Sequence, residues 1–215
     1  AERLVGKLHG LLFSDDTSRL HLGPTWKEVF DVDPVSQAAG PGAWWQSRTA
    51  ELIDEARLGT PVYVYDDETI SGACRRLQAV ESVNRVFYAM KANDNPDILR
   101  RIEAEGVGFE CVSIGELNHL KSIMTELSGE RILFTPNFAA RSEYEAAFEM
   151  GAWVTVDSLF PLTEWPEVFR GKEILLRLDP GRGHGHHAHV RTAGAQSKFG
   201  ISPEVIEDAA QAAHA

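Results

Sequence analysis

A lysine near the middle of the chain is the residue best suited to covalent chemistry. Lys91 follows an apolar stretch at 86–90, within the segment FYAMKAN at 87–93. Among apolar side chains the ammonium form of a lysine is disfavoured, so its pKa falls and the neutral amine becomes a nucleophile toward an aldehyde. The alternative is a lysine that ends a strand and reaches solvent. Because lysines with a perturbed pKa are a minority, the position alone favours this alternative.

Polar side chains recur where successive β-rich runs end. They are Lys91, Asn93, Glu110, Ser113, Asn137, Asp157, Arg177 and Asp179. In a (β/α)8 barrel all strand ends surround one mouth, whereas an open doubly wound sheet concentrates its site near one switch point. The spread of these residues along the chain therefore favours the barrel.

Some of these positions have structural interpretations as well. Ser113 and Glu116 have the spacing of a capping box for the helix that follows. Arg177 carries a permanent, forked charge, which suits a carboxylate or a cofactor oxygen and equally an ion pair with Asp179 or Asp157. The residues alone leave these alternatives open.

A loop rich in histidine and glycine at 180–200 suggests a metal site. His184, His186, His187 and His189 lie close together, and imidazole is a common ligand of zinc, nickel and copper. No cysteine lies nearby and the glycines leave the loop flexible, so we expect no physiological metal. The run PGRGHG matches neither GxGxxG after a first strand nor GxxxxGK[ST], and it predicts no phosphate-binding loop.

From Pro61 onward, short β-rich runs alternate with helical stretches. The sequence predicts strands at 62–65, 85–92, 108–113, 131–137, 153–158 and 173–179, and helices at 67–80, 96–105, 115–127, 139–149, 159–169 and from 202. This alternation predicts βαβ units and an α/β fold with a parallel sheet. A complete barrel needs more strands and typically about 250 residues. We therefore expect only the first part of a (β/α)8 TIM barrel.

The region before the barrel reads differently. Apolar spacing predicts a short amphipathic helix at 1–13, followed by loop, and a second helix at 44–58 that Gly59 ends. We therefore divide the chain into an N-terminal extension or linker at 1–45 and the barrel portion at 46–215.

Composition excludes several classes of partner. The 215 residues are 43% hydrophobic and 25% charged, which is typical of a soluble globular protein. A net charge of −11 disfavours nucleic acid and anionic membranes. No apolar run is long enough to span a bilayer, and no secretory signal is visible. Cys74 and Cys111 are too few for a disulfide framework, which suggests the cytoplasm.

The blocks of sequence that hold these polar residues resemble a known family. They are FYAMKAN at 87–93, GVGFECVSIGEL at 106–117, RILFTPN at 131–137, LLRLDPGRGHGHH at 175–187 and TAGAQSKFGI at 192–201. Together, in this order, they resemble the barrel of the fold-type III pyridoxal-phosphate decarboxylases, which include diaminopimelate and ornithine decarboxylases and share the alanine racemase barrel. The wording is most similar to the decarboxylase half of a bifunctional aspartate kinase and diaminopimelate decarboxylase. In such an enzyme, 1–45 would be kinase tail and linker.

The resemblance implies a cofactor and roles for particular residues. The cofactor is pyridoxal 5′-phosphate, which Lys91 would hold covalently before acting as an acid or base. Glu110, where relatives carry aspartate, and Arg177 are expected beside the cofactor. Further residues are expected at the active-site mouth or at an interface, and one of them, Lys198, is expected to reach a partner subunit. These are Asn93, Ser113, Glu116, Asn137, His187 and Lys198.

The implied reaction converts meso-diaminopimelate to L-lysine with release of CO2. The partners implied are a small-molecule amino-acid substrate and a second copy of the protein in a homodimer. The alternatives are a related decarboxylase or racemase for another basic amino acid, and a non-catalytic barrel fragment. Family segments that bind the phosphate and choose the substrate have no counterpart before Ala215. We therefore expect this chain alone to be inactive and poorly stable.

Overall fold

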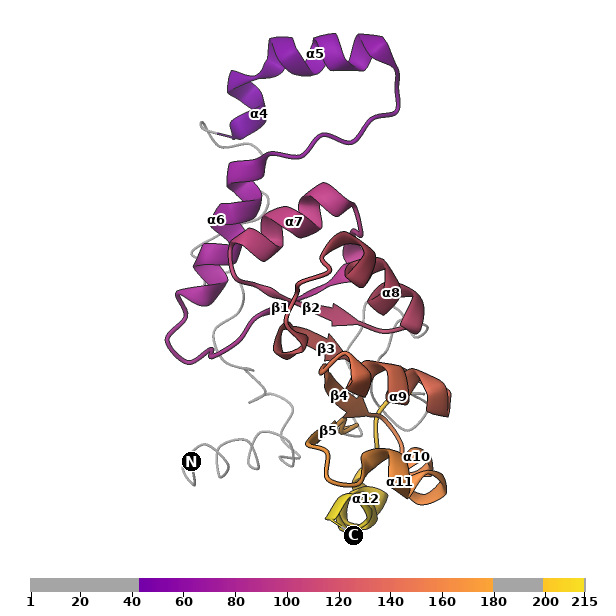
Figure 1. Cartoon of the computed structure of the whole chain (residues 1–215). Helices are drawn as coiled ribbons and strands as arrows, with labels where there is room; N and C mark the ends of the chain where they lie inside the picture. Colours follow the sequence, from indigo (N-terminus) through magenta and orange to yellow (C-terminus); the bar gives the residue numbers. More distant parts are fainter. Residues whose placement is uncertain (1–42, 180–198, 215) are drawn as a thin grey trace. The chain divides into compact units, whose positions relative to one another are not determined.

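A computed structural model describes residues 43–179 and 199–214 (Figure 1). The chain divides into two compact units between Asp66 and Asp67. The helix predicted at 1–13 lies outside the described residues, and the predicted division into 1–45 and 46–215 stays a prediction.

The described part of the first unit holds α4 (Trp44–Ser47) and α5 (Thr49–Leu58). The sequence predicted one helix over this range, but the helix breaks at Arg48, whose φ of −113° and ψ of 17° leave helical geometry. The Arg48 side chain instead donates from Nε to Glu51 at 3.0 Å, inside the first turn of α5.

The strand predicted at 62–65 is wrong. This segment forms no ladder with any described strand, and its side chains are exposed, with Tyr63 at 86%. Its β-branched and aromatic composition favours a strand. A strand, however, also needs a neighbouring strand to pair with, and no strand among the described residues forms a ladder with this segment.

The second unit is built on a sheet of five parallel strands. They are β1 (Phe87–Ala89), β2 (Gly108–Cys111), β3 (Ile132–Phe134), β4 (Trp153–Val156) and β5 (Ile174–Leu176). Each strand pairs with the next one in sequence, so the order is β1-β2-β3-β4-β5. A doubly wound sheet would reverse its order at a switch point. An order that does not reverse is that of a barrel, and the prediction of the first part of a (β/α)8 barrel is confirmed.

Helices precede, connect and follow the strands. They are α6 (Asp67–Gln78), α7 (Pro96–Ala104), α8 (Ile114–Ile123), α9 (Arg141–Glu149), α10 (Phe160–Glu164), α11 (Pro166–Phe169) and α12 (Ile206–His214), with 3-10 turns η2 (Met90–Ala92), η3 (Gly129–Arg131) and η5 (Pro203–Val205). Right-handed crossovers between neighbouring parallel strands place their helices on the same face. Figure 1 shows α7, α8 and α9 along one side of the strands.

The core lies between this face and the helices. Side chains on the helix-facing side of β2, β3 and β4 are fully buried: Phe109, Cys111, Phe134, Val154 and Val156. From α9, the buried Tyr144 ring packs edge-on against Phe134 and Phe169, with ring centroids 6.3 Å and 5.3 Å apart. Burial of each large apolar side chain stabilises the fold by about 1.5–3 kcal/mol.

Local signals set most helix boundaries. Asn95 caps α7, because its Oδ1 accepts the backbone N–H groups of Asp97 at 2.9 Å and Ile98 at 3.4 Å. The single helix predicted at 159–169 is wrong: α10 and α11 are separate. Pro166 has no N–H to continue α10 and forces the preceding residue, Trp165, out of the helical region.

No helix among the described residues has the length and apolar character that a bilayer crossing requires.

Candidate active site

Polar residues gather at the carboxyl ends of the strands. Successive side chains of a strand point to opposite faces, so Glu110 of β2 faces away from the helices, while Thr135, Asp157 and Arg177 directly follow β3, β4 and β5 at the same end of the sheet. In a barrel this face is the interior, and the carboxyl ends form its catalytic mouth. The sheet therefore brings residues from different parts of the sequence to one edge.

Lys91 and Glu110 form an ion pair at this edge. The Lys91 Nζ lies 3.2 Å from Glu110 Oε2 and 3.5 Å from Oε1. The Glu110 carboxylate is held in turn by the Thr135 hydroxyl, which donates to its Oε1. The Glu110 side chain is 15% exposed and that of Lys91 58%. The amine is therefore oriented by a partly buried carboxylate and remains open to a ligand.

The surroundings of Lys91 differ from the sequence prediction. The strand predicted at 85–92 ends at Ala89, and Lys91 belongs to the 3-10 turn η2. In this turn Met90 takes the fully buried position, with its sulfur 3.4 Å from Cys111 Sγ. The turn therefore leaves Lys91 facing Glu110 and solvent, and the apolar pocket expected around its amine is not found among the described residues.

A second pair forms between the ends of β3 and β5. Arg177 donates from Nη1 to Asn137 Oδ1 at 3.1 Å, and its guanidinium lies 4.6 Å from the centre of the Phe199 ring. The Arg177 backbone is also fixed, since its N–H donates to the Val156 carbonyl at 2.9 Å and its carbonyl accepts the Ile201 N–H at 2.7 Å. The forked cation is thus held at the same edge of the sheet as Lys91.

The buried carboxyl of Asp157 lies between these strands. Burial raises its pKa, against the opposing effects of backbone N–H groups and of the Arg177 charge. The sequence left open an ion pair between Asp157 and Arg177. Among the described residues the Arg177 side chain instead donates its hydrogen bond to Asn137, and its charge acts on Asp157 only electrostatically.

Other predicted site residues have local structural partners. Ser113 Oγ accepts the Glu116 N–H at 3.3 Å, and the Glu116 carboxylate accepts the Val112 N–H at 2.6 Å, so the predicted cap of α8 is confirmed. Asn93 Oδ1 accepts the Asn95 N–H at 3.0 Å, just before α7. The roles of these residues at the mouth stay predictions. His187 and Lys198 lie outside the described residues.

Thr135 is the site residue that the sequence reasoning missed. It stands two residues before Asn137. In an extended chain, residues two apart point to the same side. Thr135 contacts the β2 side of the edge and Asn137 the β5 side. The alternation along 131–137 was the signal that could have identified it.

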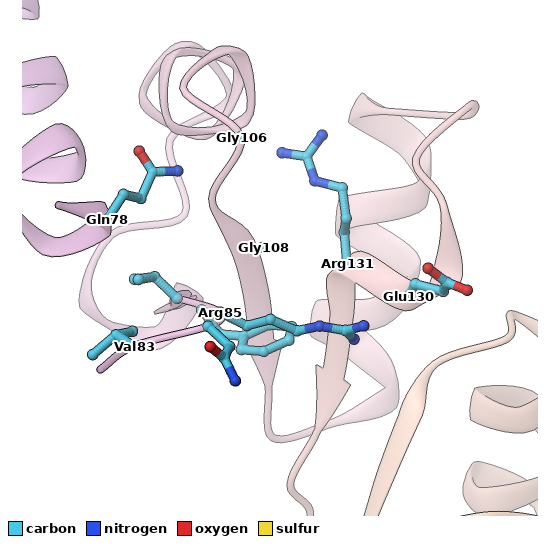
Figure 2. Close-up of a pocket in the computed structure, with 10 residues that line it drawn as sticks. Gln78, Val83, Arg85, Gly106, Gly108, Glu130 and Arg131 are labelled. Atoms are coloured by element: carbon cyan, nitrogen blue, oxygen red, sulfur yellow. The ribbon is translucent and has the colours of Figure 1, made fainter. Parts of the chain in front are cut away.

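A cavity of ≈ 240 Å³ opens at the opposite end of the sheet, where the strands begin (Figure 2). Arg85, Phe87, Gly108 and Arg131 are among its lining residues. A Cβ at Gly108 would lie 2.7 Å from both the Arg131 carbonyl and the Phe87 ring, so only glycine fits there. This end of a barrel serves stability rather than catalysis. The Lys91 edge is therefore the candidate active site.

Metal ligands are not gathered in the described ranges. No group of three or more His, Cys, Asp or Glu side chains there could hold a metal ion. The histidines at 184–189 lie outside these ranges.

Comparisons with known proteins agree with this arrangement. A family model for the pyridoxal-dependent decarboxylase, pyridoxal binding domain, matches residues 68–215. Diaminopimelate decarboxylase of Deinococcus radiodurans is 41% identical over 160 residues, which cover 74% of this chain and 41% of that protein. The enzyme of the same name from Methanothermobacter thermautotrophicus is 39% identical over 164 residues, covering 72% of this chain and 37% of that protein.

A solved structure shows the same fold. A mutant diaminopimelate decarboxylase from Helicobacter pylori, complexed with L-lysine, aligns with a TM-score of 0.64 and 25% identity, over 70% of this chain and 40% of that chain. The chain thus spans about two fifths of the length of these relatives.

Proposed function

Because this chain belongs to the pyridoxal-dependent decarboxylases, we propose that it takes part in the decarboxylation of meso-diaminopimelate to L-lysine, with release of CO2. The observation that carries the proposal is the Lys91 amine, which is held by Glu110 at the carboxyl edge of a barrel sheet and is open to a ligand. The diaminopimelate decarboxylases among its relatives support the choice of substrate.

The residues present fit pyridoxal 5′-phosphate. An exposed primary amine suits an aldehyde, since it can bind one covalently. The fixed Arg177 guanidinium suits an anionic oxygen, because its donors form a rigid fork. We infer that Lys91 holds the cofactor, and that Glu110 and Arg177 lie beside it.

The chemistry divides between cofactor and protein. When bound, pyridoxal phosphate supplies an electron sink for the electrons that remain as carbon dioxide leaves the substrate. Lys91 Nζ would hold the cofactor until the substrate binds, and would then carry a proton to or from the substrate. Glu110 orients that amine, and Thr135 fixes the Glu110 carboxylate. Arg177, held by Asn137, binds and orients an anionic group.

Borohydride reduction tests the role of Lys91. The protein is incubated with pyridoxal phosphate and reduced, and the labelled peptide is located by mass spectrometry. We expect the label on Lys91. The Lys91→Arg variant keeps a cation beside Glu110 and should lose the label, whereas Lys121→Arg, on the exposed last turn of α8, should keep it. A label elsewhere, or none, would overturn the cofactor assignment.

A panel of substrates tests the reaction. Release of CO2 is measured from meso-diaminopimelate, L-lysine, L-ornithine and L-arginine with the full-length protein. We expect turnover of meso-diaminopimelate and its loss in Lys91→Arg. Preference for another amino acid would show that meso-diaminopimelate is not the substrate. No turnover despite a labelled Lys91 would favour a non-catalytic role.

We further infer a cytoplasmic homodimer. Cys74 and Cys111 are both free and buried, which suits a reducing compartment. The dimer rests on the family resemblance, and sedimentation equilibrium of the full-length protein tests it.

A further inference from the structure

The proposed chemistry gives no role to the segment 199–201, which returns to the sheet beside the end of β5. The contact is a parallel β-bridge. The Ile201 N–H donates to the Arg177 carbonyl at 2.7 Å, and the Ile201 carbonyl accepts the Asp179 N–H at 2.9 Å. Since the Arg177 N–H donates to β4 on one side, the segment lies along the other edge of β5.

Gly200 allows the segment to come this close. Its φ of 82° lies in the left-handed region, which glycine adopts without strain. A Cβ at Gly200 would lie 2.8 Å from the Asp179 backbone nitrogen and 3.2 Å from the Arg177 carbonyl oxygen. Both are backbone atoms at the sheet edge, so a side chain here would push the segment away from β5. Position 200 therefore requires glycine.

This close approach places an aromatic ring against a cation of the candidate site. The Arg177 guanidinium carbon lies over the Phe199 ring, 4.6 Å from its centre. A guanidinium in this position is attracted by the π electrons of the ring, and more strongly where water is partly excluded. Phe199 and Arg177 are both half-buried. The contact is therefore stronger than one on the open surface.

The Arg177 guanidinium is held from two directions. Asn137, after β3, accepts from its Nη1 at 3.1 Å, and Phe199 covers one of its faces. The N–H donors of a guanidinium all lie in its plane and point outward from its edge. A ring against the face fixes this plane and leaves the edge for Asn137 and for an anion.

We propose that Phe199 is a positioning residue, which holds the Arg177 guanidinium in the orientation that binds an anionic group, and that Gly200 makes this contact possible. The inference rests on the proposed function, because it takes Arg177 to bind an anionic group of cofactor or substrate. Phe199 acts through Arg177.

The main test removes the ring and keeps apolar bulk, with Phe199→Leu in the full-length protein. The readouts are pyridoxal phosphate affinity from absorbance titration, KM, and the borohydride label. Small displacements of a binding group commonly cost an order of magnitude or more, so we expect affinity to weaken or KM to rise about tenfold, with the label still on Lys91. Phe199→Tyr keeps the aromatic face and should stay within about twofold of the wild type. Wild-type affinity and KM in Phe199→Leu would overturn the proposal.

Phe148→Leu is the matched control. The Phe148 ring of α9 packs edge-on against Phe169, and the Lys172 Nζ lies 5.6 Å from its centre. This variant therefore removes a cation–π contact of the same kind. Lys172 precedes β5 and lies at the end of the sheet opposite the candidate site. Both leucine variants should lose unfolding free energy in urea, but Phe148→Leu should keep wild-type affinity and KM. Equal losses of affinity in the two variants would overturn the proposal.

Modification of Arg177 by phenylglyoxal tests the contact without the cofactor. The reaction is run on the protein free of pyridoxal phosphate, and its rate at Arg177 is followed by mass spectrometry of the peptide. We expect the rate to rise about threefold in Phe199→Leu, the factor that a cation–π contact of this kind contributes. Phe148→Leu should react at the wild-type rate. An unchanged rate in Phe199→Leu would show that the ring does not hold the guanidinium.

A double-mutant cycle tests whether Phe199 acts through Arg177. Arg177→Lys keeps a positive charge but loses the planar fork. Residues in contact show non-additive effects, so adding Phe199→Leu to Arg177→Lys should weaken affinity by less than about twofold more. Additive losses would show that Phe199 acts by another route and would overturn the proposal.

Gly200→Ala tests the same link with the ring intact. We expect an affinity loss of about tenfold or more, because displacement of the segment removes the ring from Arg177. Wild-type affinity in Gly200→Ala would refute the role of the glycine. Failure of the proposed function is distinguishable, because the wild type would then carry no label on Lys91, whereas the phenylglyoxal rates would still report the contact.

Discussion

At the scale of single residues, Glu110 determines where the Lys91 amine lies. Its carboxylate pairs with that amine and accepts from Thr135. Glu110→Gln keeps an acceptor for Thr135 but loses the charge, so we expect near wild-type stability and slower coupling of pyridoxal phosphate, by about tenfold. Stopped-flow absorbance measures the coupling rate.

Glu110→Ala is the companion variant. It removes the acceptor as well, leaving the Thr135 hydroxyl without its partner, and should cost about 1–3 kcal/mol in unfolding free energy in addition to the slower coupling. Coupling at the wild-type rate in Glu110→Gln would show that the carboxylate does not orient the amine.

Some of these contacts could be predicted from sequence, and others could not. The positions of Lys91, Glu110, Asn137 and Arg177 at strand ends follow from the alternation of strands and helices. The exposure of Lys91 does not, because it depends on a 3-10 turn that buries Met90 instead. The alternation along 131–137 could have identified Thr135, but its partner Glu110 could not be predicted, because their contact depends on how β2 and β3 pair.

At the scale of elements, the start of α8 shows a residue pair in a structural role. Ser113 caps the helix, and Glu116 accepts from the chain that enters it. Ser113→Ala should lower the unfolding free energy by about 1 kcal/mol, since a backbone N–H at the helix start loses its acceptor. Urea unfolding at neutral pH measures this loss.

The same variant tests the predicted position of Ser113 at the mouth. If its role is the cap alone, Ser113→Ala leaves cofactor affinity and KM unchanged, whereas Ser113→Asp, which is also a good cap, restores stability. A tenfold rise in KM without loss of stability would assign Ser113 to the site instead.

Element boundaries show what local patterns omit. Strong periodicity predicted α6, α7 and α9 to within a few residues. The segment at 62–65 has strand composition, yet pairing is a property of two segments and cannot be read from one. The break between α10 and α11 could have been predicted from Pro166, because proline cannot continue the hydrogen bonds of a helix.

At the scale of the whole molecule, the sheet order explains how distant residues meet. Because the strands follow one another without reversal, each βα connection delivers its polar residues to the same edge. Lys91 contacts the end of β2, and the contacts of Thr135 and Asn137 join β3 to β2 and β5. The candidate site therefore depends on the whole five-stranded sheet, and no single βα unit contains it.

The burial of the Cys111 thiol beneath the sheet predicts how the stability of the protein responds to alkaline pH. Burial is the main reason that the pKa of the Cys111 thiol rises to about 12, from 9.0. Since the folded state holds this proton more tightly than the unfolded chain, the stability it contributes is complete below about pH 9 and is lost as pH rises toward about 12. The loss is on the order of 4 kcal/mol over that range.

Urea unfolding from about pH 8 to pH 11 measures this loss. Cys111→Ala should be less stable at neutral pH, because it leaves a small cavity, but its stability should fall less steeply with pH. The slope should change little in about 1 M salt, since desolvation outweighs the charges of Glu116 and Glu110 as its cause. Equal slopes for wild type and variant would mean that the thiol keeps an ordinary pKa in solution, and that water reaches the space between β2 and its helices.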